Sequence, residues 1–126
     1  MKEVTYLIAL GSNLSSAFEQ LEQARHFMAE RLGAPLRCSR AVATAPLGGV
    51  GRHPFANQVV ACRVALTPSQ VEATLKEIER EMGRNATASR EGVIHIDLDL
   101  LAADGHILRP TDWERPYIQA ALNELQ

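Results

Sequence analysis

Hydrophobic positions follow two different periods in the first part of the chain. Residues 4–10 form a continuous apolar run of the kind that a buried strand gives, and Gly11-Ser12-Asn13 ends it. Apolar positions then recur at helical spacing, so we expect a helix with a capping box formed by Ser16 and Glu19 and a C-terminal stop at Gly33. The apolar stripe of this helix comprises Phe18, Leu21, Ala24, Met28 and Leu32.

The middle of the chain returns to strand-like patterns before a second helix. Residues 36–42 and 57–66 are predicted strands, and residues 44–54, which are rich in Gly and Pro, are a predicted loop. Thr67-Pro68-Ser69-Gln70 is a strong helix start, because threonine suits the N-cap, proline suits the first position and glutamine closes a capping box. The apolar residues of this helix, which Gly83 ends, are Val71, Leu75, Ile78 and Met82.

Acidic residues are set into the last apolar run, at residues 94–101. Side chains alternate along a strand, so we expect His95, Asp97 and Asp99 on one face. The core-facing side then carries Ile96, Leu98 and Leu100. The two carboxylates lie roughly 6.5–7 Å apart along such a strand, and a pair of this kind suits Mg²⁺, which commonly takes one or two carboxylates plus substrate phosphates. An edge strand with a solvated acidic face is the other interpretation, and it stays open at this point.

The order of these elements predicts the fold class. Strand, helix, two strands, helix and strand, with Asp104-Gly105 as the turn of a short hairpin, predict an α+β fold, a ferredoxin-like βαββαβ sandwich with an added C-terminal hairpin. Residues 1–126 are enough for one domain and too few for two ordinary ones. A short C-terminal helix is predicted from the spacing of Ile118, Ala121, Leu122 and Leu125.

Composition and charge exclude several classes of protein. The formal net charge of −2 argues against a non-specific nucleic-acid binder and against attraction to an anionic membrane surface. No cationic leader and no apolar run near 18 residues are present, so we expect a soluble, cytoplasmic protein. A monomer or weak homo-oligomer is the expected state of assembly. Cys38 and Cys62 lie outside any metal-ligand spacing and are interpreted as reduced intracellular thiols.

Five motifs occur in one order and at suitable spacings. They are Ala9-Leu10-Gly11-Ser12-Asn13-Leu14, Thr44-Ala45-Pro46-Leu47-Gly48, Phe55-Ala56-Asn57, Ile78-Glu79-Arg80-Glu81-Met82-Gly83-Arg84 and Ile96-Asp97-Leu98-Asp99-Leu100-Leu101. Together they resemble the 6-hydroxymethyl-7,8-dihydropterin pyrophosphokinases of folate biosynthesis. The resemblance covers most of the chain, and five motifs in sequence are far more specific than any one of them.

The resemblance implies a reaction and a metal. Enzymes of this family transfer pyrophosphate from ATP to the hydroxymethyl group of the pterin and release AMP. Two aspartates on one strand bind the Mg²⁺ that bridges the ATP phosphates. Asp97 and Asp99 match these positions, so the resemblance makes them catalytic residues and metal ligands, with Mg²⁺ as the cofactor and ATP as the co-substrate.

The resemblance also implies a pterin pocket and a nucleotide site. The pterin-binding positions match Thr44, Ala45, Leu47, Phe55 and Asn57. An aromatic face and an amide suit a flat heterocycle, since the ring can stack and the amide can both donate and accept along its edge. The ATP-binding positions match Glu79, Arg84, Arg90 and Leu100, with Arg84 also among the catalytic residues. For Gly11-Ser12-Asn13 we favour helix capping over phosphate or pterin binding.

Several phosphate-binding arginines of the family are replaced in this chain. Where the family has Arg-Trp-Gly-Pro-Arg, Glu91 stands at the tryptophan position and Ile94 at the final arginine, and Ala86 replaces a further arginine. Arginines supply much of the charge stabilisation in phosphoryl transfer. The alternatives are therefore a catalytically impaired relative that binds a pterin or another heterocycle, and an interaction module with a vestigial pocket. The candidates to replace the missing family arginines are Arg52, Arg109 and Arg115. The sequence alone does not position them.

Overall fold

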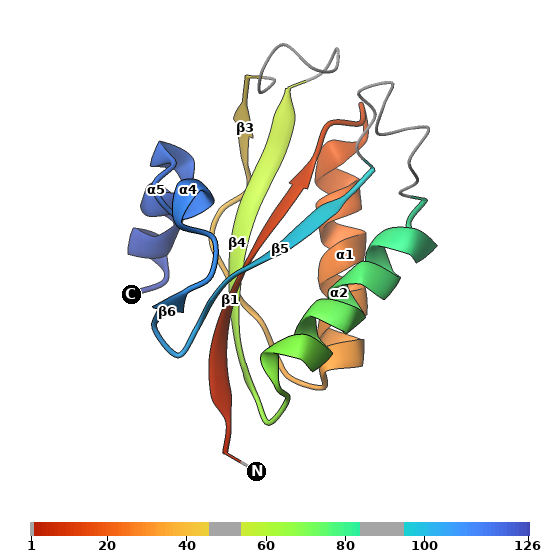
Figure 1. The fold of residues 1–126 in the computed structure, drawn as a ribbon. Helices are drawn as coiled ribbons and strands as arrows, with labels where there is room; N and C mark the ends of the chain where they lie inside the picture. Colours follow the sequence, from red (N-terminus) through yellow and green to blue (C-terminus); the bar gives the residue numbers. More distant parts are fainter. Residues whose placement is uncertain (1, 46–53, 84–94) are drawn as a thin grey trace.

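The central strand of the sheet is the first strand of the chain. The structure, a computed structural model, describes residues 2–45, 54–83 and 95–126. In it β1 (Val4–Ser12) pairs antiparallel with β4 (Phe55–Val64) on one side and with β5 (Asp97–Ala103) on the other. β2 (Arg37–Cys38) and β3 (Val42–Thr44) pair with β4, and β6 (His106–Ile107) pairs with β5. The fold is therefore α+β with an antiparallel sheet in the order β2-β4-β1-β5-β6, and β3 lies beside β4 (Figure 1).

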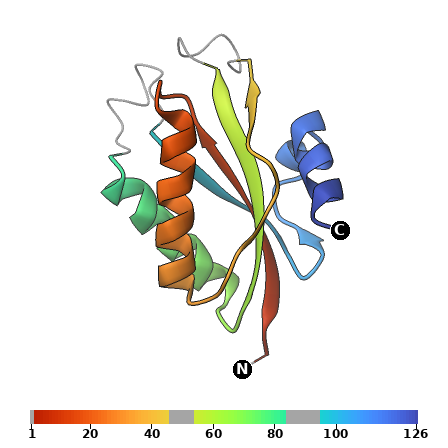
Figure 2. The ribbon, with the colours of Figure 1, turned by 180° about the vertical axis from the view of Figure 1, so that it is seen from behind.

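Two helices cover one face of this sheet. α1 (Ala17–Leu32) and α2 (Pro68–Glu81) pack against each other and against the sheet (Figures 1 and 2). The main core lies between these helices and the sheet and includes the fully buried side chains of Tyr6, Ile8, Leu21, Met28, Leu75, Ile78 and Ile96. The apolar runs of the strands and the helical stripes thus meet on one face.

Two short helices cover part of the opposite face. α4 (Pro110–Trp113) and α5 (Pro116–Glu124) follow the β5–β6 hairpin and pack back on β4 and β5 (Figure 2). They bury a second, smaller cluster of Val59, Leu101, Ile118 and Ala121. The short helix that the sequence predicts near the C-terminus is confirmed as α5.

Several predicted strand boundaries are wrong, and β4, predicted over residues 57–66, begins at Phe55 and ends at Val64. The predicted strand over residues 36–42 is divided into β2 and β3, and Thr44, predicted to start a loop, ends β3. Ser39 lies in the gap, where its Oγ accepts a hydrogen bond from the Val59 N–H at 3.0 Å and its carbonyl accepts one from Gln58 Nε2 at 2.6 Å. Side chains therefore take over part of the strand ladder at this point, which a periodicity argument does not anticipate.

The N-terminus of α1 also differs from the prediction. Ser16 is the N-cap, but its side chain makes no capping hydrogen bond, so the predicted box with Glu19 does not form. The buried stripe begins at Ala17, and Phe18, predicted to be part of it, is 52% exposed. Because Ala17 and Leu21 are four residues apart, Phe18 falls at the edge of the stripe. The stop at Gly33 is confirmed, with the residue in the left-handed region at φ 75°.

The predictions for α2 and for the C-terminal hairpin are confirmed. Thr67 Oγ1 accepts a hydrogen bond from the Gln70 N–H, and Gln70 Oε1 accepts one from the Thr67 N–H, which completes the capping box. Asp104 and Gly105 both have positive φ, as a tight two-residue turn requires. Within the described part of the chain, no helix has the length and apolar character that crossing a membrane requires.

The two N-caps provide a matched test of this local structure. Thr67→Ala should lower the free energy of unfolding by about 1 kcal/mol, because it leaves the Gln70 N–H without its side-chain acceptor. Ser16→Ala removes the same kind of side chain from a cap that makes no such bond, and should cost less than about 0.5 kcal/mol. Urea denaturation followed by circular dichroism measures both. Equal losses in the two variants would contradict the assignment of the caps.

Candidate functional site

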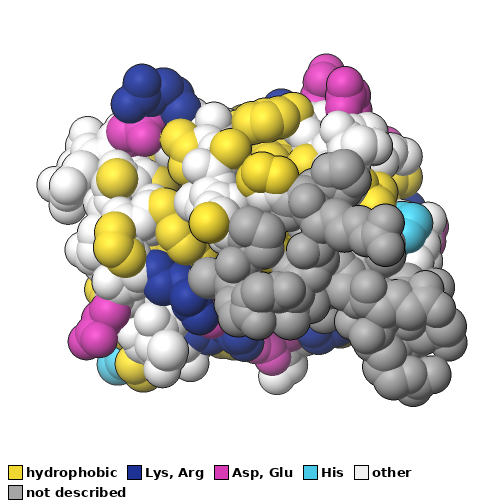
Figure 3. Space-filling view, turned by 90° about the horizontal axis from the view of Figure 1, so that it is seen from above, with side chains coloured by type: hydrophobic (Ala, Val, Ile, Leu, Met, Phe, Trp, Pro, Cys, Tyr) yellow, Lys and Arg dark blue, Asp and Glu magenta, His cyan; other side chains and the backbone are white. Residues whose placement is uncertain are grey.

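The candidate site lies on the sheet face opposite α1 and α2, at the end where β1 finishes and β4 and β5 begin. Gly11 of β1 is opposite Asn57 of β4 on one side and opposite Asp97 of β5 on the other. Residues opposite each other on neighbouring strands point to the same face. Seen from this end of the sheet, the described surface carries hydrophobic side chains and a group of Lys and Arg side chains (Figure 3).

Gly11 forms a floor without a side chain between the amide and the carboxylate. A Cβ at this position would stand 3.5 Å from Asn57 Oδ1 and 3.8 Å from Phe55 Cδ1. The next residue of β1 on this face is Ala9, opposite Val59 and Asp99. Two small residues in the central strand, Gly11, which is buried, and Ala9, which is half-buried, therefore separate the polar side chains of β4 from those of β5.

The prediction that Gly11-Ser12-Asn13 caps the first helix is wrong. β1 continues through Ser12, and the N-cap of α1 is Ser16. Gly11 is thus a candidate site residue that the sequence analysis assigned to another role. The signal that identifies it is its register between Asn57 and Asp97, which appears only when the strands are paired.

Asn57 is held in one orientation by its neighbours. Its side chain is 6% exposed, and its Nδ2 donates to Thr44 Oγ1 at 2.6 Å and to the Phe55 carbonyl at 3.4 Å. The amide nitrogen is therefore occupied on the β3 side, while Oδ1 faces the floor at Gly11. Of the predicted pterin-binding residues, the structure brings Thr44, Phe55 and Asn57 together.

The other two predicted pterin-binding residues are placed differently. Ala45 follows the end of β3 and is exposed. Leu47 lies outside the described residues.

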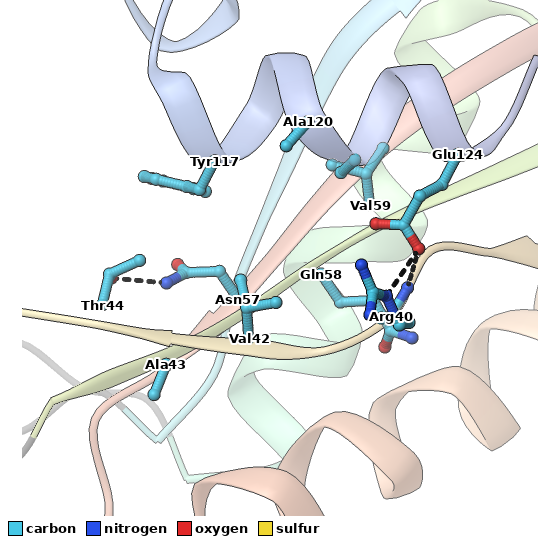
Figure 4. A pocket seen from close by; sticks show the side chains of 11 residues that line it. Arg40, Val42, Ala43, Thr44, Asn57, Gln58, Val59, Tyr117, Ala120 and Glu124 are labelled. Carbon is cyan, nitrogen blue, oxygen red and sulfur yellow. Dashed lines mark hydrogen bonds and ion pairs between the residues drawn. The ribbon is translucent and has the colours of Figure 1, made fainter.

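A cavity of about 250 Å³ opens beside Thr44 and Asn57, between β3, β4 and α5. Tyr117 of α5 lies across it from these two residues, and the ion pair of Arg40 with Glu124 closes its far end (Figure 4). Burial raises the pKa of Tyr117, the charge of Arg115 lowers it, and the charges of Asp112, Asp99 and Asp97 raise it, with a net upward shift. The tyrosine is therefore within electrostatic reach of the carboxylates on β5, and the sequence analysis did not single it out as a site residue.

Asp97 and Asp99 share the same face of β5, as the alternation predicts. Ile96, Leu98 and Leu100 are buried in the main core on the other face. Burial, the charge of Asp97 and a hydrogen bond with Asp97 raise the pKa of Asp99 to about 7, against a smaller lowering by Arg109. The two carboxyl groups are thus close enough to share a proton, as two like charges held close together do. The interpretation as a freely solvated acidic edge does not fit Asp99, whose side chain is 21% exposed.

The donor set fits a magnesium ion. Both donors are carboxylates, and Mg²⁺ binds through one or two carboxylates while water and phosphate fill the remaining positions. In residues 2–45, 54–83 and 95–126, no group of three His, Cys, Asp or Glu side chains suited to a metal ion is present. A pair of carboxylates suits a metal that brings a phosphate ligand with it.

Glu79 links α2 to the first part of β5. Its side chain is buried, and its Oε2 accepts a hydrogen bond from the Leu98 N–H at 2.7 Å. Lys76 Nζ lies 3.4 Å from Glu79 Oε1. This carboxylate therefore has a structural role in holding the strand, which the prediction of an ATP-binding role did not include.

The remaining predicted ATP-binding residues fall in two groups. The Leu100 side chain is 3% exposed and belongs to the core, so only its backbone is available to a ligand. Leu98 turns its N–H away from β1, and Leu100 has the same backbone orientation because it is two residues further along the strand. Arg84 and Arg90 lie outside the described residues.

Two arginines that the sequence could not position flank the carboxylates. Arg109 Nη1 lies 3.8 Å from Asp99 Oδ1, and Arg109 Nε donates to Asp112 Oδ2 at 2.7 Å. Arg115 Nε donates to the other oxygen of Asp112 at 3.0 Å. Burial raises the pKa of Asp112 and the hydrogen bonds from both arginines lower it, with a net downward shift. One carboxylate thus holds two guanidinium groups beside the site.

Comparison with known proteins identifies relatives over nearly the whole chain. A model of the 7,8-dihydro-6-hydroxymethylpterin-pyrophosphokinase (HPPK) family matches residues 7–126. The chain is 34% identical over 134 residues to a 2-amino-4-hydroxy-6-hydroxymethyldihydropteridine pyrophosphokinase of Porphyromonas gingivalis, covering 97% of this chain and 90% of that protein. It is 32% identical over 107 residues to a protein of the same name from Haemophilus influenzae, covering 84% and 66%. A folate synthesis bifunctional protein of Arabidopsis thaliana is 31% identical over 127 residues, covering 94% of this chain and 26% of that protein.

The raised pKa of Asp99 predicts how stability depends on pH in metal-free protein. A carboxyl group whose pKa is raised on folding, here from 3.8 to about 7, stabilises the native state below its unfolded pKa and loses this contribution as pH rises through about 7. Between pH 4 and pH 7.5, the wild type should therefore lose free energy of unfolding relative to the Asp99→Asn variant. Urea denaturation in EDTA measures it, and a difference that stays constant with pH would contradict the burial and pairing of Asp99.

Proposed function

Because the chain belongs to the 7,8-dihydro-6-hydroxymethylpterin-pyrophosphokinase family, we propose that it transfers pyrophosphate from ATP to 6-hydroxymethyl-7,8-dihydropterin and releases AMP, in folate biosynthesis. The observation that carries the proposal is the row of Asn57, Gly11 and Asp97 across β4, β1 and β5. It puts an oriented amide and a carboxylate pair on either side of a floor without a side chain, an arrangement that suits a substrate with a heterocycle and a reacting hydroxyl.

The heterocycle binds over Gly11 in this proposal. Asn57 offers Oδ1 toward that floor, since its Nδ2 is held by Thr44 and by the Phe55 carbonyl. A flat ring gains from an aromatic face such as Phe55, and an amide fixed in orientation selects one pattern of donors along the ring edge. Ala45 and Leu47 contribute from the adjacent segment on the basis of the family resemblance alone.

The carboxylates bind Mg²⁺ together with the nucleotide. When bound, the ion would neutralise charge on the phosphates and on Asp97 and Asp99, where burial and the charge of Asp97 raise the pKa of Asp99. The pterin hydroxymethyl oxygen attacks the β-phosphorus, the bond from that phosphorus to the α–β bridging oxygen breaks, and AMP leaves while the hydroxyl proton is lost. The chain contributes mainly positioning and charge.

The nucleotide site is proposed along the outer side of β5. Leu100 offers backbone groups there, and Lys76 and Arg109 line a cavity of about 110 Å³ with it. Glu79 supports the strand at this place, and Arg84 and Arg90 are assigned to the phosphates by resemblance. We also propose that the chain is one domain with the ferredoxin-like βαββαβ arrangement, which the strand order β2-β4-β1-β5-β6 supports.

A nucleotide assay tests the proposed reaction. Purified protein with Mg²⁺, ATP and 6-hydroxymethyl-7,8-dihydropterin should form AMP, with no ADP, and only when the pterin is present. Asp97→Ala should lower the rate by at least about 100-fold, because one charge-stabilising interaction with phosphoryl oxygens is worth that much. Asp104→Asn is the matched control, since it removes an aspartate at the hairpin turn at the other end of β5 and should keep full activity.

The same assay separates the proposal from its alternative. The replacements Ala86, Glu91 and Ile94 at family arginine and tryptophan positions favour a binding protein that has lost catalysis. Wild-type protein that binds the pterin in calorimetry but forms no more AMP than Asp97→Ala does would contradict the proposed activity and support that alternative. Protein that binds neither pterin nor nucleotide would contradict both.

Gly11→Ala tests the location of the heterocycle. The added methyl group would make ordinary contacts at 3.5 Å with Asn57 Oδ1 and 3.8 Å with Phe55 Cδ1, so the fold should tolerate it and gain up to about 1 kcal/mol from the loss of glycine. The same methyl group would stand where the heterocycle is proposed to bind, so the pterin Kd should rise at least about tenfold, the equivalent of 1.4 kcal/mol. Thermal unfolding and calorimetry measure the two effects. Unchanged pterin affinity would place the heterocycle elsewhere.

A further inference from the structure

Arg109 contacts the carboxylate pair from a part of the chain that none of the five motifs includes. It lies between β6 and α4, and its Nη1 is 3.8 Å from Asp99 Oδ1. The guanidinium therefore forms an ion pair with one of the two candidate metal ligands.

Asp112 fixes where this guanidinium points. It accepts from Arg109 Nε at 2.7 Å through one oxygen and from Arg115 Nε at 3.0 Å through the other. With Nε bound to Asp112, the outer nitrogens of Arg109 project from the α4 turn toward Asp99. A side chain held through Nε loses less entropy when its outer nitrogens bind a ligand.

Arg109 also reaches the proposed nucleotide site. It lines the cavity of about 110 Å³ beside the outer edge of β5, together with Lys76, Leu98, Asp99 and Leu100. Half of its side chain is exposed, so its outer nitrogens are accessible to a ligand. A guanidinium presents donors in a planar fork that matches two oxygens of a phosphate, and it binds such oxygens more strongly than a neutral donor does.

We propose that Arg109 is a phosphate-binding residue for a nucleoside triphosphate with its divalent cation, positioned by Asp112, and that it exchanges Asp99 for the phosphates when this ligand binds. The inference rests on the proposed function and deepens it. It supplies from the α4 turn a cation of the kind that the chain lacks at residues 86 and 94, where the family resemblance implies arginines.

Such an exchange has opposite consequences for the metal and for the nucleotide. Without nucleotide, Arg109 and a divalent cation compete for the charge of Asp99, so the arginine weakens binding of the metal alone. With nucleotide, the metal takes the carboxylates and Arg109 binds the phosphates, so the arginine strengthens binding of the complex. A residue that merely supports the fold would shift both affinities in the same direction or neither.

The experiment compares wild type with Arg109→Gln. Mn²⁺ alone is titrated and followed by electron paramagnetic resonance, and the Mg²⁺ complex of α,β-methylene ATP, in which the scissile bridging oxygen is replaced, is titrated by calorimetry. In the variant, the Kd for Mn²⁺ alone should fall about threefold. The Kd for the nucleotide complex should rise roughly 10- to 100-fold, as the loss of a charge-assisted contact implies.

Two further variants control the result. Arg63→Gln removes the same charge from an arginine that is 70% exposed on β4 and pairs with Glu3, and it should leave both affinities unchanged. Arg109→Lys keeps the charge and loses the fork, so it should restore the wild-type affinity for Mn²⁺ and recover nucleotide binding only in part. Urea denaturation checks that each variant is folded.

The outcomes separate this inference from the proposed function. Wild type that binds the nucleotide complex while Arg109→Gln binds it equally well overturns the role of Arg109 and leaves the proposed function standing. Weaker binding of both ligands by the variant makes Arg109 a structural residue and also overturns the inference. Wild type that binds Mn²⁺ and does not bind the nucleotide complex overturns the proposed use of ATP itself. Opposite shifts for the two ligands support the exchange.

Discussion

The pairing of β1 with β4 and β5 is the constraint on which the site depends. Side chains alternate along a strand, so a slip of β5 by one residue would turn Asp97 and Asp99 into the core and expose Leu98 and Leu100. Glu79 resists such a slip, because its buried carboxylate accepts the Leu98 N–H from the opposite side of the strand. The register of three strands thereby decides which residues meet at Gly11.

The same register brings together charges that repel one another. Asp97 and Asp99 are two residues apart on one strand, and their interaction together with burial raises the pKa of Asp99 to about 7. Packing for stability alone does not account for this arrangement, since two like charges held close together in a partly buried place are costly in free energy. Arg109, which Asp112 holds in place, offsets part of this cost through its ion pair with Asp99.

The sequence predicted the parts of the site that depend on local pattern. Alternation alone gave the shared face of Asp97 and Asp99, and the motif order gave the cluster of Thr44, Phe55 and Asn57 that β3 and β4 bring together. Gly11 was assigned to a helix cap because a glycine before a polar pair is typical of a turn, and only strand pairing reveals its position in the row. Tyr117 and Arg109 lie on elements whose position is set by packing against the second core cluster, which no local period encodes. The division of the edge strand at Ser39 was missed for a similar reason, because it goes with hydrogen bonds of the Ser39 and Gln58 side chains between this segment and β4.

The position of Arg109 indicates how the positive charge of such a site can come from different residues while the geometry of the site is kept. The carboxylates and the floor are parts of a central sheet, where each residue is constrained by two neighbouring strands. Arg109 instead sits between a two-residue strand and a four-residue helix, where a substitution disturbs few other contacts. What a guanidinium needs there is a fixed direction, and Asp112 supplies it with one hydrogen bond. A cation that is required only near the phosphates can therefore come from a different position in the sequence, whereas Asn57, Gly11 and Asp97 are fixed by the pairing of their strands.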